Sequence, residues 1–132
     1  MPEHPNVTRI RQLFAAFLAA DVATIRDLIP EDATWHFPGR RGHLAGAHHG
    51  REAIFTFLLQ VRALTDDTFR LELLDVLAND HNAVALFHGS GQRNGKTLAN
   101  PTCLRMRLVE GRVMEVWEFV WDLYDVDEFW SS

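Results

Sequence analysis

The first half of the chain carries apolar residues at the three-to-four-residue spacing of amphipathic helices. Pro5 stands just before the first run as a start signal. Asp21 can cap the second run, and Pro30 ends it. A third run follows Gly50 and stops at a Thr-Asp-Asp sequence. This pattern predicts three helices, over residues 6–20, 22–29 and 51–64.

Strand patterns dominate the rest of the chain. Ala33 to Phe37 is aromatic and β-branched and is followed by Pro-Gly, which predicts a short strand. Residues 40–50 are rich in Gly and His and have no period, so we expect a loop there. Beyond Phe69, alternating segments are separated by turn signals, among them the hairpin sequence Asn94-Gly95. These segments predict a meander of antiparallel strands over residues 69–78, 83–93, 97–109 and 112–122.

The alternation divides each of these strands into two sets of residues that point to opposite faces of the sheet. The more apolar set is expected to face the helices, and its few polar members include His88, Glu118 and Asp122. The other set mixes charged and aromatic residues and is expected to be half solvated or buried against a second subunit. Its members include Arg105, Arg107, Glu115, Trp117 and Phe119.

Composition narrows the class of protein. The chain has 132 residues, 47% of them hydrophobic, which fits one domain over residues 1–132. The net charge is -5 and the basic residues are scattered, so no surface for nucleic acid is expected. Cys103 is the single cysteine and excludes an internal disulfide, and no apolar run marks a signal peptide or membrane span. We therefore expect a cytoplasmic protein without membrane partners.

Several stretches of the sequence are similar to a known family. They are Ala33-Thr34-Trp35-His36-Phe37-Pro38-Gly39, Leu44-Ala45-Gly46 followed by Gly50-Arg51-Glu52-Ala53-Ile54, Glu110-Gly111-Arg112-Val113, and Asp122-Leu123-Tyr124 with Asp127-Glu128-Phe129-Trp130. Together with the order of the elements, they resemble the nuclear transport factor 2-like superfamily and its SnoaL-like branch, which is related to ketosteroid isomerases.

The resemblance implies an α+β fold in which a cone-shaped, curved antiparallel sheet wraps around N-terminal helices and encloses a pocket. It also implies a homodimer through the convex sheet face and no metal or organic cofactor. The implied ligand is a small apolar metabolite that bears a carbonyl, and the implied reaction is acid/base isomerisation or cyclisation. Because the superfamily includes non-enzymatic members, a ligand-binding or protein-association domain is the alternative.

Four residues are candidates for the acid/base chemistry. Asp122 resembles the late Asp that acts as acid or base in SnoaL-like cyclases; alternatively, it caps the C-terminal segment. Glu118 lies about 13 Å back on the same strand face, either deep in the pocket or paired with an Arg. His88 would relay protons, the commonest role of histidine in acid/base chemistry, or it is a core histidine. His36 is either a pocket residue or exposed at a strand end.

The pocket wall is expected to come from apolar side chains of the helices and strands. His43, His48 and His49 could in principle meet at a metal, but they lack Cys or acidic partners at ligand spacing, so no metal site is expected. The residues that we expect to bind substrate are Phe14, Phe17, Trp35, Phe57, Leu86, Met106 and Val120.

Overall fold

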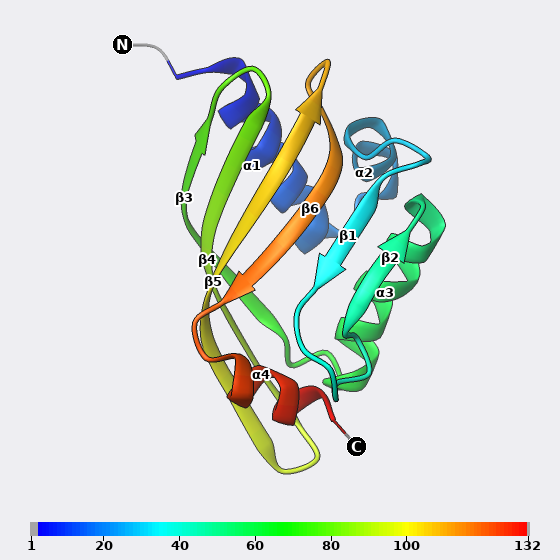
Figure 1. The fold of residues 1–132 in the computed structure, drawn as a ribbon, viewed down its shortest axis with the longest axis vertical. Helices are drawn as coiled ribbons and strands as arrows, with labels where there is room; N and C mark the ends of the chain where they lie inside the picture. Colours follow the sequence, from blue (N-terminus) through cyan, green and yellow to red (C-terminus); the bar gives the residue numbers. More distant parts are fainter. Residues whose placement is uncertain (1–2, 132) are drawn as a thin grey trace.

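The computed structural model describes residues 3–131 and confirms the α+β class, with a curved, mainly antiparallel sheet packed against helices (Figure 1). The three predicted helices form within two residues of their expected limits. Asp21 caps the second helix as expected, because its carboxylate accepts a hydrogen bond from the Thr24 amide at 3.2 Å. The helices are α1 (Pro5–Ala19), α2 (Val22–Leu28) and α3 (Arg51–Leu64).

The predicted short strand and the predicted meander are also present. Each strand of the meander pairs antiparallel with the next, and Asn94 and Gly95 form a tight turn with positive φ at both residues. The short C-terminal helix α4 (Leu123–Trp130) follows the last strand. The strands are β1 (Thr34–Phe37), β3 (Arg70–Ala78), β4 (Asn82–Arg93), β5 (Lys96–Val109) and β6 (Arg112–Val120).

The prediction of a loop over residues 40–50 is wrong at its end. Residues 46–49 form a strand, β2 (Gly46–His49), which pairs antiparallel with β1. β2 is an edge strand whose side chains are largely exposed, so burial imposes no alternation on its sequence. The pattern of apolar residues therefore carried no sign of it.

The sheet joins distant parts of the chain. Its strand order is β2-β1-β6-β5-β4-β3, so the short β1–β2 hairpin adds to the meander through β6. The β1–β6 pair is parallel and sets Trp35 beside Val116. Figure 1 shows α1 behind the long strands, with α2 and α3 beside the β1–β2 hairpin. The inner face of the sheet and these helices enclose the core.

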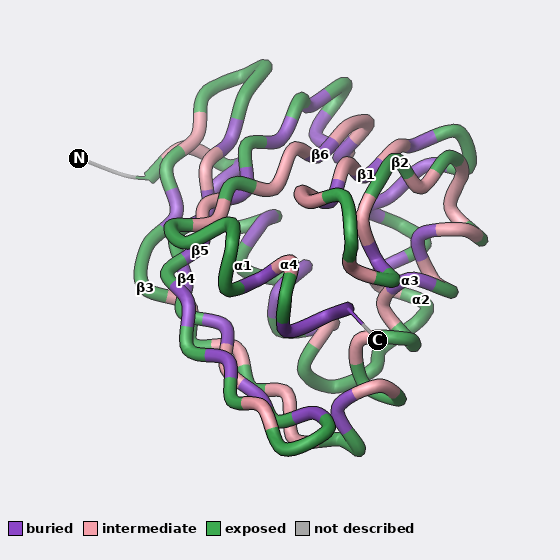
Figure 2. The backbone as a smooth tube through the Cα atoms, turned by 60° about the horizontal axis from the view of Figure 1, so that its bottom comes forward, coloured by how far each residue is buried: buried purple, intermediate pink, exposed green. Residues whose placement is uncertain are grey.

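The two faces of β4 are the reverse of the predicted ones. Buried residues alternate with exposed ones along β4 and β5 (Figure 2), and on β4 the buried set is Ala83, Ala85, Phe87, Gly89 and Gly91. The Phe69 side chain lies against both glycines, where a Cβ atom would approach the ring within 3.5 Å. Small residues on the inner face thus make room for aromatic rings, and the larger aliphatic residues of β4 point outward.

The C-terminal helix packs on the core. Phe129 and Trp130 are buried, whereas Tyr124 is 89% exposed. Buried Arg93 donates hydrogen bonds to the main-chain carbonyls of Phe129 and Ser131. These bonds satisfy carbonyl groups that the helix end leaves without partners and hold α4 against β4. Within residues 3–131, the helices are all too short or too polar to cross a bilayer.

Candidate functional site

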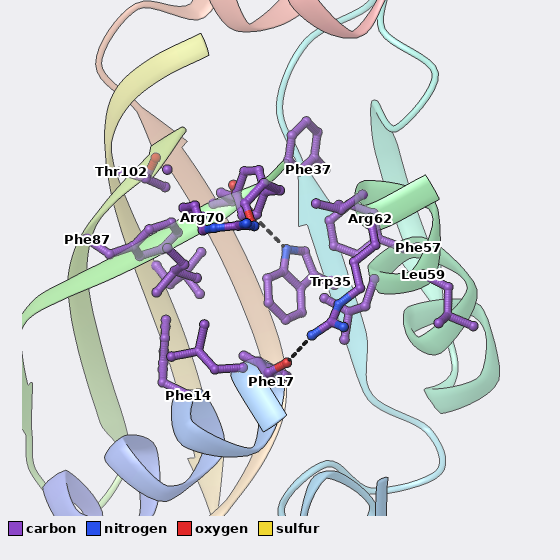
Figure 3. Close-up of a pocket in the computed structure, with 18 of the residues that line it drawn as sticks. Phe14, Phe17, Trp35, Phe37, Phe57, Leu59, Arg62, Arg70, Phe87 and Thr102 are labelled. Carbon is purple, nitrogen blue, oxygen red and sulfur yellow. Dashed lines mark hydrogen bonds between the residues drawn. The ribbon is translucent and has the colours of Figure 1, made fainter. Parts of the chain in front are cut away.

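A cavity of about 700 Å³ lies between the inner face of the sheet and the helices. Its wall is mostly apolar and includes many aromatic rings (Figure 3), several of which contact one another. The centroid of the Trp35 ring lies 5.4 Å from that of Phe57 and 6.1 Å from that of Phe17. Phe14 bridges Phe17 and Phe87 across the cavity wall. Such a wall suits a flat, apolar ligand.

Glu118 brings a carboxyl group into this apolar wall. It lies on the inner face of β6, opposite Leu104 of β5. The indole Nε1 of Trp35 donates a hydrogen bond to its Oε1 at 3.1 Å. Burial disfavours the ionised form and raises the pKa of Glu118 to about 7, although the Trp35 hydrogen bond acts in the opposite direction. Near neutral pH this carboxyl group can therefore both accept and release a proton.

Two further polar residues line the cavity near Glu118, but their hydrogen bonds serve the protein. The Asn100 side chain accepts a hydrogen bond from the Trp121 amide at 3.0 Å and donates one to the Asp122 carbonyl at 3.4 Å. The Thr102 hydroxyl donates to the Asn100 carbonyl at 3.3 Å. These contacts fix the end of β6 and leave Glu118 as the titratable group of the inner wall.

The lining residues that are exposed come from the end of α1, from the start of α2, from helix α3 and from the start of β3, and they mark the mouth of the cavity. It combines exposed aliphatic residues, such as Leu18 and Leu59, with charged ones. The charged residues are Glu52, Arg62, Asp67 and Arg70. The cavity is thus apolar at depth and mixed at its rim.

Both candidate histidines lie on the outer face of the sheet, so the prediction that His88 faces the helices is wrong. His88 is exposed in the β4 set that points away from the helices. His36 Nε2 lies 2.6 Å from Glu115 Oε2, and its ring stacks on Trp117 with centroids 5.5 Å apart. Neither histidine lines the cavity. Glu115 belongs to the outer face, as the alternation predicts.

Asp122 begins α4 and does not line the cavity. Its carboxylate accepts a hydrogen bond from the Asp125 amide at 3.0 Å, which is the geometry of an N-cap. The side chain is exposed, so the structure places it in the capping position. Of the candidate acids and histidines, Glu118 is therefore the one that reaches the cavity.

The residues expected to bind substrate divide in the same way. Leu86 is 37% exposed on the outer face of β4, because the faces of that strand are reversed. Met106 points inward but is packed in the core away from the cavity. The others line the cavity: Phe14, Phe17, Trp35, Phe57 and Val120.

The three histidines near β2 have other contacts. His48 stacks on Phe57 and its Nε2 lies 2.8 Å from the Leu44 carbonyl, while His49 Nδ1 lies 3.3 Å from the Thr34 hydroxyl. Throughout residues 3–131, no three His, Cys, Asp or Glu side chains are grouped so that they could hold a metal ion.

Comparison with known proteins decides the family. The profile of the SnoaL-like domain matches residues 10–116. This chain belongs to the SnoaL-like domain family. Structures with NTF2-like and cystatin-like folds also superpose on it.

Three relatives show how far the similarity extends. Bal32a, from a soil-derived mobile gene cassette, is 38% identical with a TM-score of 0.89, over 95% of both chains. The uncharacterised protein Rv0034 of Mycobacterium tuberculosis is 28% identical over 99% of this chain and all of its own length. TerC, co-crystallised with polyporic acid, has a TM-score of 0.80 at 20% identity and covers 98% of this chain and 100% of its own. This last likeness is one of fold alone.

Several cavity residues of this SnoaL-like domain escaped the sequence prediction. Phe87 belongs to the β4 set that was assigned to the outer face. Phe37 follows His36 on β1 and alternates with it, so the same phase that places Trp35 inside also places Phe37 inside. Arg62 and Arg70 occupy exposed positions, where the apolar pattern gives no signal.

Removing the indole N–H of Trp35 should raise the pKa of Glu118 further. In Trp35→Phe, the ionised carboxylate loses its hydrogen-bond donor while burial persists, so we expect a pKa above the present value of about 7. NMR titration of the labelled Glu118 carboxyl carbon measures it. Phe57→Leu, which changes the same aromatic cluster without touching the hydrogen bond, is the control. An equal shift in both variants, or no shift in Trp35→Phe, contradicts the role given to the indole.

Proposed function

We propose that this SnoaL-like domain binds a small, apolar, ring-bearing carbonyl compound in its cavity and transfers a proton at the carbon beside the carbonyl. Glu118 is the acid/base group. The observation that carries the proposal is a carboxyl group with a pKa of about 7 in an aromatic cavity. A general acid/base works best when its pKa lies near the operating pH.

The proposed step uses Glu118 alone among the candidate acids and histidines. Its carboxylate takes the proton from the carbon, and the electron pair of that C–H bond moves to the carbonyl oxygen to give an enolate. With an unsaturated carbonyl compound the enolate is a dienolate, and the carboxylic acid returns the proton to its γ-carbon, which is isomerisation. Alternatively, the enolate carbon attacks a second carbonyl of the same molecule and the carboxylic acid protonates the alkoxide that forms, which is cyclisation. The aromatic wall excludes water and holds the ring system in place.

Similar proteins lend support to small-molecule binding. TerC shares the fold and was crystallised with polyporic acid. The alternative, a non-catalytic binding or association domain, would have its cavity acids neutralised by arginine. No arginine or lysine of residues 3–131 forms an ion pair with Glu118, which is bonded to Trp35 instead. This contact favours the enzyme.

The proposal is tested in two steps. Thermal-shift screening against aromatic and alicyclic ketones identifies compounds that stabilise the folded protein. Proton NMR in D₂O then follows exchange of the hydrogens beside the carbonyl of each hit. Exchange accelerated by the protein supports the proposal. Binding without accelerated exchange across all hits supports the non-catalytic alternative and contradicts the catalytic role.

We also propose that the protein is a homodimer through the outer face of β4, β5 and β6. On this face the Arg105 guanidinium lies 4.3 Å from the centre of the Trp117 ring, and Phe119 is 56% exposed. Aromatic and arginine side chains are enriched at interfaces, and a two-fold axis would use this patch twice.

Phe119→Asp should convert the dimer to a monomer, because it would place a carboxylate in an apolar contact on both subunits. Sedimentation velocity at several protein concentrations measures the change. Leu59→Asp, an equal change at the cavity mouth, should leave the dimer intact. A wild-type monomer at every concentration would contradict the proposed dimer.

A further inference from the structure

Two arginines at the cavity mouth are held in place by main-chain carbonyls. Arg62 of α3 donates a hydrogen bond from Nη2 to the Phe17 carbonyl at 2.8 Å, which ties α3 to the end of α1. Arg70 of β3 donates from Nη1 to the carbonyls of Asp67 and Phe69, at 2.8 and 2.9 Å. Both line the cavity, and Figure 3 shows both side chains reaching over it.

These two guanidinium groups are positioned but not neutralised. Across residues 3–131, neither forms an ion pair with a carboxylate, whereas the rim residue Glu52 is paired with Arg26 at 3.4 Å. A guanidinium has five N–H donors, and each of these groups uses Nη1 or Nη2 alone for its carbonyls. The remaining donors are available to a ligand. Asp67 also lines the cavity, and its carboxylate would repel an anion bound by the two arginines.

We propose that Arg62 and Arg70 form an anion subsite, and that the ligand is amphipathic, with an apolar ring system and one carboxylate or similar anionic group. The ring system enters the aromatic cavity and the anionic group stays at the mouth. Arginine suits this role because its planar fork matches a carboxylate. Burying the anion beside Glu118 instead would cost far more, because no cation pairs with Glu118 there.

This subsite deepens the proposed function, since it orients the ligand within the same cavity. With the charged end fixed at the rim, the uncharged ring system and its carbonyl point inward toward Glu118. An amphipathic acid therefore enters in one direction, whereas a neutral ketone of the same shape has no such preference.

A pair of fluorescent probes tests the subsite directly. 8-Anilinonaphthalene-1-sulfonate carries an anionic group, and N-phenyl-1-naphthylamine has the same ring system without it. Both brighten in apolar sites, and competition between them shows whether they share the cavity.

We expect Arg62→Gln/Arg70→Gln to weaken binding of the sulfonate probe by about tenfold, because two partly exposed charge-assisted contacts are lost. The neutral probe should change by less than about twofold, because its burial is unaltered. High salt should weaken the sulfonate probe alone.

Matched variants make the test selective. Arg11→Gln/Arg40→Gln removes the same amount of charge at positions outside the cavity lining, and it should change the affinity for neither probe. Asp67→Asn removes the repelling carboxylate and should raise the affinity for the sulfonate probe by about twofold. Asn tolerates the positive φ of 60° at this position.

Unchanged sulfonate affinity in the Arg62/Arg70 variant, or equal losses for both probes, would overturn the proposal. Its failure is distinguishable from failure of the proposed function. Charge-selective binding without proton exchange keeps the subsite and removes the catalytic role of Glu118, and exchange without charge selectivity does the reverse.

Discussion

Glu118→Gln should reduce protein-catalysed proton exchange on a bound carbonyl compound by roughly 10²- to 10⁴-fold, the usual contribution of a general acid/base. Gln keeps the size of the side chain and can still accept the hydrogen bond from Trp35, but it cannot take up a proton. Binding of the compound should therefore change little. The rate constant for exchange at saturating compound, followed by NMR in D₂O, measures the loss.

The pH dependence of the wild-type protein follows from the same group. Acting as a base, Glu118 must be ionised, so kcat/KM should rise with pH and level off above about 7, where its pKa lies. Below that point the slope should approach tenfold per pH unit. The residual rate of Glu118→Gln should lack this rise.

Two variants serve as controls for position. Glu115→Gln makes the same chemical change three residues earlier on β6, but its side chain lies on the outer face against His36. His88→Ala removes a titratable group that is exposed on the outer face of β4. Both should retain exchange. Full activity in Glu118→Gln, or loss in His88→Ala, would show that the reacting proton is carried elsewhere.

Glu118→Gln should also stabilise the folded protein at alkaline pH. Burial raises the pKa of Glu118 from an ordinary value of 4.5 to about 7, so between these values the native state binds more protons than the unfolded state. Stability therefore falls as pH rises through this window, and the fall is complete above about pH 7. The shift corresponds to about 3 kcal/mol. Gln has no ionised form and avoids this loss.

Urea unfolding at a series of pH values measures the difference. The free energies of unfolding of wild type and Glu118→Gln should nearly coincide near pH 4.5 and diverge by up to about 3 kcal/mol at pH 8, with the variant more stable. Glu72→Gln, at an exposed position on β3, should give a curve parallel to that of the wild type. A pH-independent difference for Glu118→Gln would contradict the raised pKa.

Most of the fold could be predicted because apolar spacing reports burial. α1 and β5 each bury one face, and their sequences show it. The pattern of β4 indicated the wrong face, because its inner face carries small residues, with the Phe69 ring against Gly89 and Gly91, and its outer face carries Val84 and Leu86. When a strand carries small residues on its inner face to make room for a large ring, its outer face becomes the more apolar one, and the pattern then predicts the wrong face.

The site was harder to predict, because the identity of an acidic residue or a histidine does not reveal whether it lies in the cavity or on the surface. Asp122 and Glu118 share one alternation pattern, but β6 ends at Val120, and Asp122 turns away to cap α4. His36 and Glu115 pair across the parallel β1–β6 contact, which requires knowledge of strand order. Glu118 could be placed correctly because it still lies within β6, where alternation holds.

The parallel β1–β6 contact also bears on how the molecule folds. β1 is made early in synthesis, but the strand beside it in the sheet lies about eighty residues later, so closing this contact is among the steps with the greatest loop entropy. Trp35 and Glu118 face each other across that contact. The carboxyl group and its hydrogen-bond donor are thus brought together by a long-range pairing that requires nearly the whole chain, and a partly folded chain has no assembled site.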